Sequence, residues 1–154
     1  MIKEDIHTEF KSSFNDGGIE SLCAFANTKG GRVLIGIADS GKPVKGFSIG
    51  NEMLQNWVNE VKNKTQPSII PDANVIEIGS AEVVELSVKE FPVKPVAFKG
   101  RYLKRVNNAN HQLSLSEIAD LHLRSFNTSW DSYINPDRDL NSLSLEKVNR
   151  FISN

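Results

Sequence analysis

The sequence predicts an α+β fold in which helices flank a mixed, mostly antiparallel sheet. Apolar residues recur at helical spacing in several separate stretches of the chain, a pattern typical of amphipathic helices. Between these stretches lie short runs rich in β-branched residues, joined in pairs by brief turn segments, which is typical of antiparallel hairpins. Helices mixed with mostly antiparallel strands favour the α+β class.

Size and composition are those of an ordinary globular domain. The chain has 154 residues, of which 39% are hydrophobic and 24% are charged, and these proportions are unexceptional. The single cysteine, Cys23, excludes an internal disulfide and a cysteine-rich zinc site. The charged N-terminal segment lacks the apolar core of a signal peptide, and no apolar stretch reaches the roughly 18–20 residues that span a bilayer. We therefore expect a cytoplasmic protein without a membrane partner.

The first half of the chain is expected to contain a helix that leads directly into a buried strand. Apolar residues at helical spacing predict the helix over 19–27, with Asp16 as a candidate cap. Gly30 and Gly31 would end it, one of them in the left-handed conformation that glycine adopts cheaply. The apolar run 33–37 does not alternate with polar residues, so we expect a strand buried on both faces.

The second half is expected to form two hairpins between helices. The predicted ranges are a helix over 51–64, strands over 75–78 and 83–88, and strands over 96–98 and 102–106 around a basic turn. Ser114 and Glu117 have the spacing of a capping box and predict a helix that continues to Phe126. A polar loop is expected over 127–139. A last amphipathic pattern over 143–152 fits either a docked helix or one that leads into a further region.

The first candidate site is a basic hairpin with an interleaved tyrosine. Its basic residues are Lys99, Arg101, Lys104 and Arg105, and Tyr102 lies among them. Basic side chains supply salt-dependent contacts to phosphates, and the tyrosine would stack on an unpaired base. A solvated edge strand protected by lysines would have the same pattern. Because the formal net charge of the chain is −1, binding would depend on this local patch.

A second candidate site consists of three carboxylates and a lysine. Glu4, Glu9 and Asp39 would converge if the opening segment pairs with the strand that precedes Asp39. Clustered carboxylates bind Mg²⁺ or Mn²⁺, and such an ion activates water and neutralises charge on a phosphodiester. Lys11 would contact the phosphate or stabilise a developing charge. The alternative is that these are solvated residues of a chain start and a turn.

Other patterns argue against further functions. The glycine pair precedes a strand instead of following one, and no Walker A motif is present, so neither a dinucleotide site nor an ATP site is expected in this chain. Cys23 lies on the apolar side of its helix, as expected for a packed thiol. The histidines share no spacing typical of metal ligands.

An ordered series of short motifs resembles the Schlafen-type AlbA-like domain. The motifs are Glu9-Phe10-Lys11, residues 24–31 (AFANTKGG), 33–41 (VLIGIADSG), 67–71 (PSIIP), 94–96 (KPV) and 99–106 (KGRYLKRV), followed by Ser129-Trp130-Asp131. The resemblance extends over roughly residues 4–131. Each motif is weak alone, and their succession in this order is specific.

The resemblance implies the N-terminal, nucleic-acid-binding domain of a bacterial transcriptional regulator, with DNA favoured over RNA as the partner. The domain would occupy residues 1–128, and 129–154 would be a connector and the start of a C-terminal helix. The basic surface of the family is carried over to Lys29 and Arg32 as well as to the basic hairpin. A single copy of the domain could also form a homodimer.

The resemblance also implies a possible catalytic role for the carboxylates. Vertebrate Schlafen relatives include metal-dependent ribonucleases that use two glutamates and an aspartate, and Glu4, Glu9 and Asp39 stand at the matching positions. This chain departs from those enzymes in its short segment over 14–19 and in having one copy of the domain. Three functions therefore stay open: a nucleic-acid-binding module, a metal-dependent endonuclease or endoribonuclease, and a dimerisation or partner-docking domain, which the near-neutral charge favours.

Overall fold

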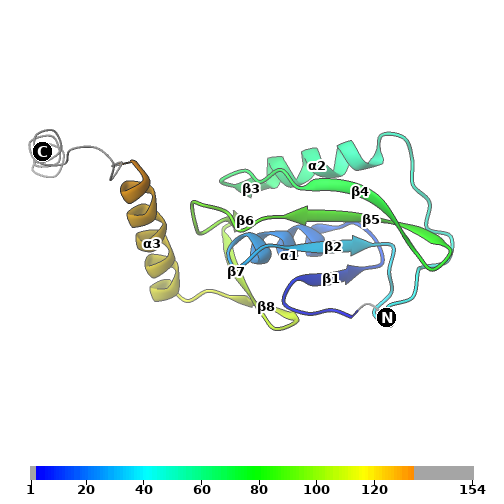
Figure 1. Ribbon diagram of the computed structural model, residues 1–154, viewed down its shortest axis with the longest axis horizontal. Coiled ribbons are helices and arrows are strands. Elements are labelled where there is room, and N and C mark those ends of the chain that lie inside the picture. The colour runs from blue at the N-terminus through cyan, green and yellow to red at the C-terminus, as the bar shows by residue number, and fades with distance from the viewer. Residues whose placement is uncertain (1–2, 134–154) are drawn as a thin grey trace, which may run out of the picture.

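The computed structural model describes residues 3–133, with side chains as far as Phe126, and its fold belongs to the predicted α+β class (Figure 1). The described part contains three helices and two four-stranded sheets. In chain order the elements are β1 (Thr8–Lys11), α1 (Asp16–Ala26), β2 (Gly31–Ile35), α2 (Met53–Lys64), β3 (Thr65–Gln66), β4 (Asp72–Ile78), β5 (Ala81–Val88), β6 (Ala97–Phe98), β7 (Arg101–Val106), β8 (Ala109–Gln112) and α3 (Leu115–Tyr133).

The two sheets lie on either side of α1. The first sheet has the strand order β1-β2-β5-β4, in which β1 and β2 are parallel and the other pairs antiparallel. The second sheet, β3-β6-β7-β8, is antiparallel throughout. Because β1 and β2 are parallel neighbours, the chain must cross between them, and α1 is that crossover helix. It contacts β2 on one side and β7 on the other.

The main apolar core surrounds α1. Ile19, Leu22 and Phe25 of this helix are fully buried together with residues of β2, β5 and β6. The end of the helix is fixed to the second sheet by Asn27, whose side-chain amide donates to the carbonyls of Val96 and Leu103 at 2.9 and 2.8 Å. The amide oxygen of Asn27 also accepts a hydrogen bond from the backbone N–H of Val96 at 2.6 Å.

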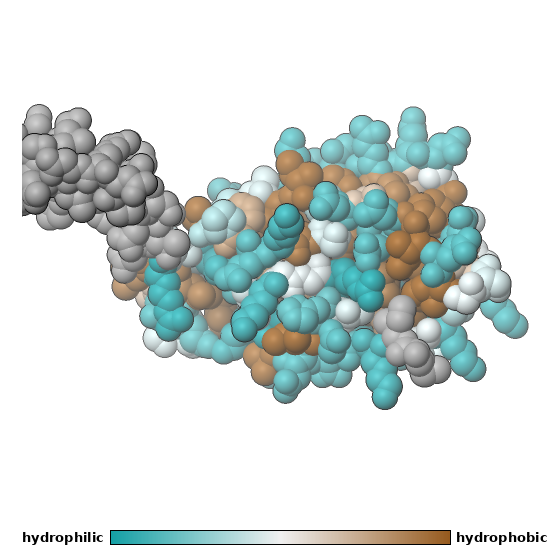
Figure 2. Space-filling model, viewed as in Figure 1, coloured by the Kyte–Doolittle hydropathy of each residue, from teal (hydrophilic) through white to brown (hydrophobic). Residues whose placement is uncertain are grey.

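The expectation that the strand after the glycine pair is buried on both faces is confirmed. Val33, Leu34 and Ile35 of β2 are all 0% exposed. Val33 and Ile35 belong to the core around α1, whereas Leu34 belongs to a smaller apolar cluster with Phe10 and Val83. Figure 2 shows apolar side chains gathered toward the right-hand part of the face that it presents.

The glycine pair itself is a compact helix-to-strand connection. Gly30 has a φ of +77°, and a Cβ there would lie 2.8 Å from the carbonyl oxygen of Val88. At Gly31 a Cβ would lie 2.6 Å from the ring of Phe25. The first position therefore needs glycine for its left-handed backbone and for space, and the second for space alone.

The helix starts differ in part from their predictions. The cap of α1 is Asn15, whose side chain accepts from the N–H of Gly17 at 2.9 Å, so the expectation for Asp16 was wrong by one residue. The predicted capping box of α3 is confirmed. The backbone N–H of Ser114 donates to Glu117 at 2.9 Å, and the N–H of Glu117 donates to the Ser114 hydroxyl at 3.2 Å.

Three elements were missed or placed wrongly, the first of them the two-residue strand β3, which is too short to form an apolar run. β8 was not predicted, because its sequence, ANHQ, has no apolar alternation. The loop expected from residue 127 is helical as far as Tyr133, since residues 127–133 contain neither glycine nor proline to end α3. The helix predicted over 143–152 lies outside the described residues. Among the helices that the structure describes, none is long and apolar enough to cross a membrane.

Candidate nucleic-acid interface

The predicted basic hairpin is formed by β6 and β7, and its tip lies over the start of α1. Lys99 and Gly100 both have positive φ, as a type I′ turn requires. This turn presents Lys99 and Arg101, whose side chains are 60% and 49% exposed. The Lys99 Nζ lies 2.7 Å from Asp16 Oδ2, and Arg101 pairs with Glu20. Both exposed cations of the tip are therefore held by carboxylates of α1.

The remaining residues of the hairpin also have partners within the chain. Lys104 pairs with Glu117 and so joins β7 to the start of α3. The Lys104 ammonium lowers the pKa of the Glu117 carboxyl to about 2, and the hydrogen bond from the Ser114 N–H is the second cause of this shift. Tyr102 is half-buried, and so it is only partly available for stacking on a base.

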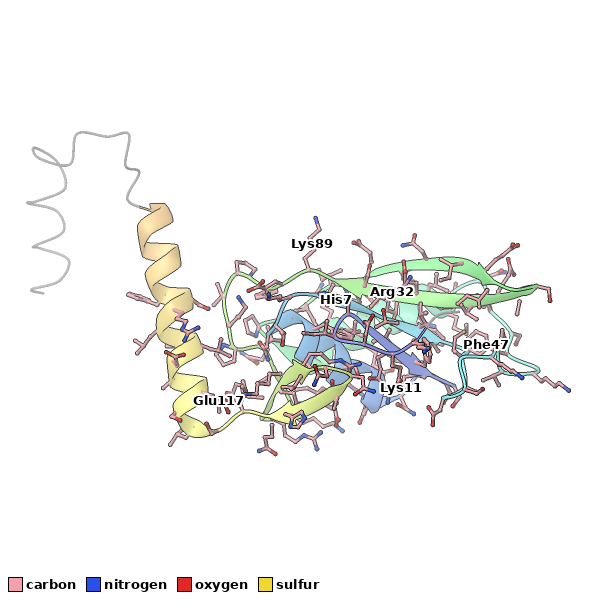
Figure 3. The ribbon with its side chains drawn as sticks, turned by 60° about the horizontal axis from the view of Figure 1, so that its bottom comes forward. His7, Lys11, Arg32, Phe47, Lys89 and Glu117 are labelled. Atoms are coloured by element: carbon pink, nitrogen blue, oxygen red, sulfur yellow. The ribbon has the colours of Figure 1, made fainter. Side chains whose placement is uncertain are left out.

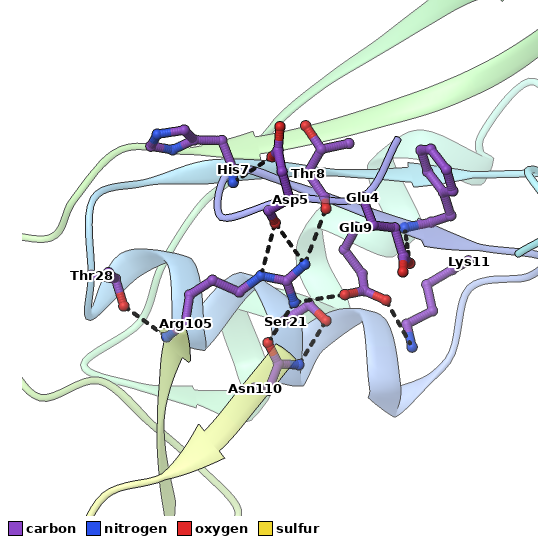
Figure 4. Close-up of polar contacts among 11 residues, drawn as sticks. Glu4, Asp5, His7, Thr8, Glu9, Lys11, Ser21, Thr28, Arg105 and Asn110 are labelled. Carbon is purple, nitrogen blue, oxygen red and sulfur yellow. Dashed lines mark hydrogen bonds and ion pairs between the residues drawn. The ribbon is translucent and has the colours of Figure 1, made fainter. Parts of the chain in front are cut away.

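Arg105 is buried, contrary to the expectation of an exposed basic residue. Its side chain is 0% exposed, and Arg105 Nη1 lies 2.6 Å from Glu9 Oε1. The same guanidinium donates to the carbonyls of Asp5 and Thr8 at 2.9 and 3.0 Å and to the side chain of Asn110 at 2.8 Å (Figure 4). Arg105 thus joins β7 and β8 to the segment that leads into β1, and it is not a surface contact for a ligand.

Arg105 is buried because it lies on the side of β7 that faces α1 and away from the turn, where Arg101 of the same side is exposed. Leu103 and Arg105 point to the same side of the strand, and both are buried. The Arg105 guanidinium lies 4.8 Å from the ring of Phe25, in cation–π contact with α1. A buried arginine of this kind requires several acceptors, and the carboxylate and backbone carbonyls supply them.

The three carboxylates of the second candidate site have different environments. The pKa of the Glu9 carboxyl is raised. Burial of Glu9 is the largest cause and the neighbouring Glu4 is the next, while Arg105 acts in the opposite direction. Glu4 also accepts a hydrogen bond from the N–H of Phe10 at 3.0 Å. Asp39 is exposed on the turn that follows Ile37. In the described part of the chain, no three His, Cys, Asp or Glu side chains form a group that could hold a metal ion.

The expected convergence of all three carboxylates is therefore absent from this structure, although β1 does pair with β2 as the expectation required. The reason is that Glu9 turns toward Arg105, on the side of α1, while the chain leaves β2 at Gly36 before it reaches Asp39. Lys11 lies 3.7 Å from Glu9 Oε2, and so the second candidate site consists here of a Glu4–Glu9 pair between two cations.

A different set of basic side chains gathers at one end of the first sheet. We call His7, Lys29, Arg32 and Lys89 the sheet-end group. The backbone N–H of Arg32 donates to the carbonyl of His7 at 2.8 Å, and the His7 ring contacts the carbonyl of Gly30 at 3.2 Å. Gly31 is paired with Val88, so Lys89 follows at the same end of the sheet. Figure 3 shows His7, Arg32 and Lys89 in this part of the molecule.

The lysines of the sheet-end group differ from the exposed cations of the basic hairpin in their ion pairing. Lys29, Lys89 and His7 are exposed. Neither Lys29 nor Lys89 has a carboxylate within 4.0 Å among the residues whose side chains are described, whereas Arg32 pairs with Glu85 at 2.9 Å. The sequence indicated Lys29 and Arg32 only through the family resemblance. It missed His7 and Lys89, because their proximity comes from the pairing of β1 and β5 with β2.

The sequence model of the family described as "Schlafen, AlbA_2" matches residues 4–114, well over half of the chain. The chain belongs to this family. The family resemblance carried by the ordered motifs is thereby confirmed. The match includes β1 to β8 and ends at the start of α3, so that both the sheet-end group and the basic hairpin belong to the Schlafen AlbA_2 domain.

Individual relatives share parts of this domain. An ATP-binding protein of Ureaplasma parvum is 35% identical in a 74-residue alignment that covers 44% of this chain and 21% of that protein. The DIP2311 protein of Corynebacterium diphtheriae has a similar solved structure, with a TM-score of 0.59 and 16% identity over 74% of this chain and 23% of that one. The chain therefore spans less than a quarter of the length of either protein.

A third similarity has a lower TM-score. The N-terminal domain of a RecG-related protein from Nitrosomonas europaea matches 71% of this chain and 82% of that one, with 21% identity and a TM-score of 0.47. At 16% identity, the structure of the DIP2311 protein bears on the fold alone.

Proposed function

We propose that this chain is a nucleic-acid-binding domain and that the sheet-end group supplies its main phosphate contacts. The observation that carries the proposal is the exposure of Lys29 and Lys89 beside Arg32, with no carboxylate paired to either lysine among the described side chains. Membership of the Schlafen AlbA_2 family supports a function related to nucleic acids. Ammonium groups without a protein partner bind phosphates by releasing counterions, and they displace no ion pair in doing so.

The basic hairpin has a secondary role in this proposal. Lys99 and Arg101 can approach a phosphate only in competition with Asp16 and Glu20. Exposed ion pairs contribute about 0–1 kcal/mol, so replacing the carboxylate partner of Lys99 or Arg101 with a phosphate costs little free energy. The carboxylates of Asp16 and Glu20 nevertheless remain nearby and repel the phosphate. We further propose duplex DNA as the partner and a bacterial transcriptional regulator as the setting, because the motif resemblance points to such regulators.

The test compares three pairs of alanine substitutions in binding to labelled duplex DNA and structured RNA. Lys29→Ala with Lys89→Ala removes two proposed contacts, so we expect affinity to fall by roughly tenfold and the salt slope of log Kobs to fall by about 2. Lys42→Ala with Lys45→Ala is the matched control, because both lysines are exposed and follow the opposite end of β2. This control is expected to bind as the unaltered chain does.

The third pair separates the two surfaces. Lys99→Ala with Arg101→Ala is expected to weaken binding less than the sheet-end pair does. If it weakens binding more, and the sheet-end pair behaves as the control, then the basic hairpin is the contact surface and the proposal is wrong. Parallel samples with Mg²⁺, Mn²⁺ or EDTA report cleavage, and metal-dependent cleavage would make the domain a nuclease.

A further inference from the structure

The two edge strands of the first sheet differ in how their outer backbone groups are used. These strands are β1 and β4, and Figure 1 shows β4 as the outermost strand on the side away from β1. Along β1, the N–H of Phe10 donates to Glu4 at 3.0 Å. The carbonyl of Thr8 accepts from Arg105, also at 3.0 Å. Side chains of the domain thus occupy the edge of β1, and a further strand could pair there only by displacing them.

The edge of β4 has no such protection. This strand is seven residues long and pairs with β5 in one continuous register, without a bulge. Its sequence, DANVIEI, contains no lysine, arginine or proline, whereas edge strands commonly carry lysine, proline or a bulge that discourages further pairing. The edge strands of the second sheet, β3 and β8, have only two and four residues. Among the described strands, β4 is therefore the longest edge and the one best suited to accept another strand.

Three residues of β4 direct their backbone groups outward. Ile78 and Ala81 flank the two-residue turn of the β4–β5 hairpin, so they form a hydrogen-bonded pair. Because inward and outward groups alternate along an antiparallel strand, the N–H and C=O groups of Ala73, Val75 and Glu77 point away from β5. No turn or loop of the described chain bonds to these groups. The helix α2 packs against β4, yet Val75 remains 44% exposed, so the middle of this edge is accessible.

We propose that two copies of the chain pair through β4, edge to edge and antiparallel, so that their first sheets form one continuous sheet. A two-fold axis at Val75 places each outward-facing residue opposite an outward-facing residue of the second copy. Val75 then pairs with Val75, and Ala73 pairs with Glu77. Each such pair exchanges two N–H···O bonds. An axis at any other residue of β4 would leave some of these groups without a partner.

The side chains of β4 fit this self-pairing. The exposed Val75 lies opposite its equivalent at the centre, and cross-strand pairs of β-branched residues stabilise a sheet. In the same register Asp72 lies opposite Ile78. Glu77 lies opposite Ala73. No two acidic side chains therefore face each other, and the repulsion that directly opposed like charges would cause is avoided.

The protected edge of β1 limits the assembly to two copies. After β4 has paired, the outer edges of the continuous sheet are the two β1 strands. Their outward groups already bond to Glu4 and Arg105, so a third copy finds no open edge in this sheet. The result is a closed two-fold dimer, the commonest form of soluble oligomer. The proposal does not depend on nucleic-acid binding.

A charge-swap experiment on the full chain tests both the interface and its register. Sedimentation velocity of the unaltered chain is expected to show a species with the mass of two chains. Val75→Lys and Val75→Glu each place like charges opposite each other at the axis, so the dissociation constant of either variant alone should rise about tenfold or more. An equimolar mixture of the two variants is expected to recover most of the lost affinity, because a lysine then faces a glutamate.

Val93→Lys is the matched control, since Val93 is 46% exposed in the loop after β5 and the same change is made away from the edge. It should dimerise as the unaltered chain does. Val75 is exposed, so its variants should keep the fold, and circular dichroism checks this. A chain that stays monomeric at submillimolar concentration would overturn the proposal. A dimer that neither Val75 variant weakens, or a mixture no tighter than the separate variants, would overturn it as well.

Discussion

At the scale of single residues, Arg105 is the side chain whose role differs most from its place in the sequence. Four basic residues follow one another closely in residues 99–105, and their spacing does not tell exposed from buried ones. Leu103 shares its side of β7 with both Arg101 and Arg105, and only Arg105, which lies farther from the turn, is buried. The acceptors came from far along the chain, because Arg105 and Asp5 are separated by 100 residues.

Replacing Arg105 is expected to be costly. Arg105→Met leaves Glu9, only 13% exposed, with Lys11 at 3.7 Å as its remaining cation and removes a donor from the carbonyls of Asp5 and Thr8. Breaking a buried pair on one side typically costs about 3–5 kcal/mol. Urea unfolding measures the loss. As a comparison, Asp16→Asn removes only exposed pairs and should cost below about 1 kcal/mol; equal losses in the two variants would contradict the assignment of Arg105 as a buried hub.

The Lys104–Glu117 pair predicts an acid-dependent contact. The pKa of Glu117 is lowered from 4.5 to about 2, so the pair stabilises the folded chain above pH 4.5 and this contribution is lost as the pH falls to about 2. Lys104→Met removes the largest cause, and the pKa should rise toward 4.5 in an NMR titration of the carboxyl. Arg124→Met is the control, and this substitution should leave the pKa of Glu117 unchanged. A Glu117 pKa of about 2 in Lys104→Met would assign the shift to Ser114 instead.

At the scale of elements, the sequence predicted individual helices, strands and turns better than the contacts between them. The helix-to-strand connection at Gly30, the two hairpins and the capping box of α3 follow from local rules, and each is confirmed. The position of the basic hairpin over α1 does not follow from them. Its ion pair between Lys99 and Asp16 joins residues 83 positions apart, and nothing in the spacing of either residue identifies the other.

The connection between α1 and β2 gives a prediction at this scale. Gly30→Ala has an unfavourable positive φ and a Cβ 2.8 Å from the Val88 carbonyl oxygen. Gly46→Ala has a similar φ of +80° with no atom within 4 Å of the added Cβ. Strained backbone costs about 1–3 kcal/mol, so both variants should lose stability in thermal unfolding, and Gly30→Ala should lose more. Equal losses would mean that the turn shifts to relieve the contact.

At the scale of the whole molecule, the fold class could be predicted and the division into two sheets could not. Strand lengths and turns are local, whereas the sheet that a strand joins depends on contacts across α1. The candidate site has the same limit. Lys29 and Arg32 were within reach of the motif resemblance, but Lys89 is placed beside them by pairing between β2 and β5, which residue types alone do not specify.

The position of α1 between the sheets has a consequence for how the domain opens. Phe25 lies under Gly31 of the first sheet and beside Arg105 of the second, and Asn27 bonds to the backbone of the second sheet at three points. Neither sheet can separate from the helix without breaking contacts that the other also needs. The amide protons of α1 should therefore exchange with solvent only when the entire domain unfolds, so that two sheets behave as a single cooperative unit.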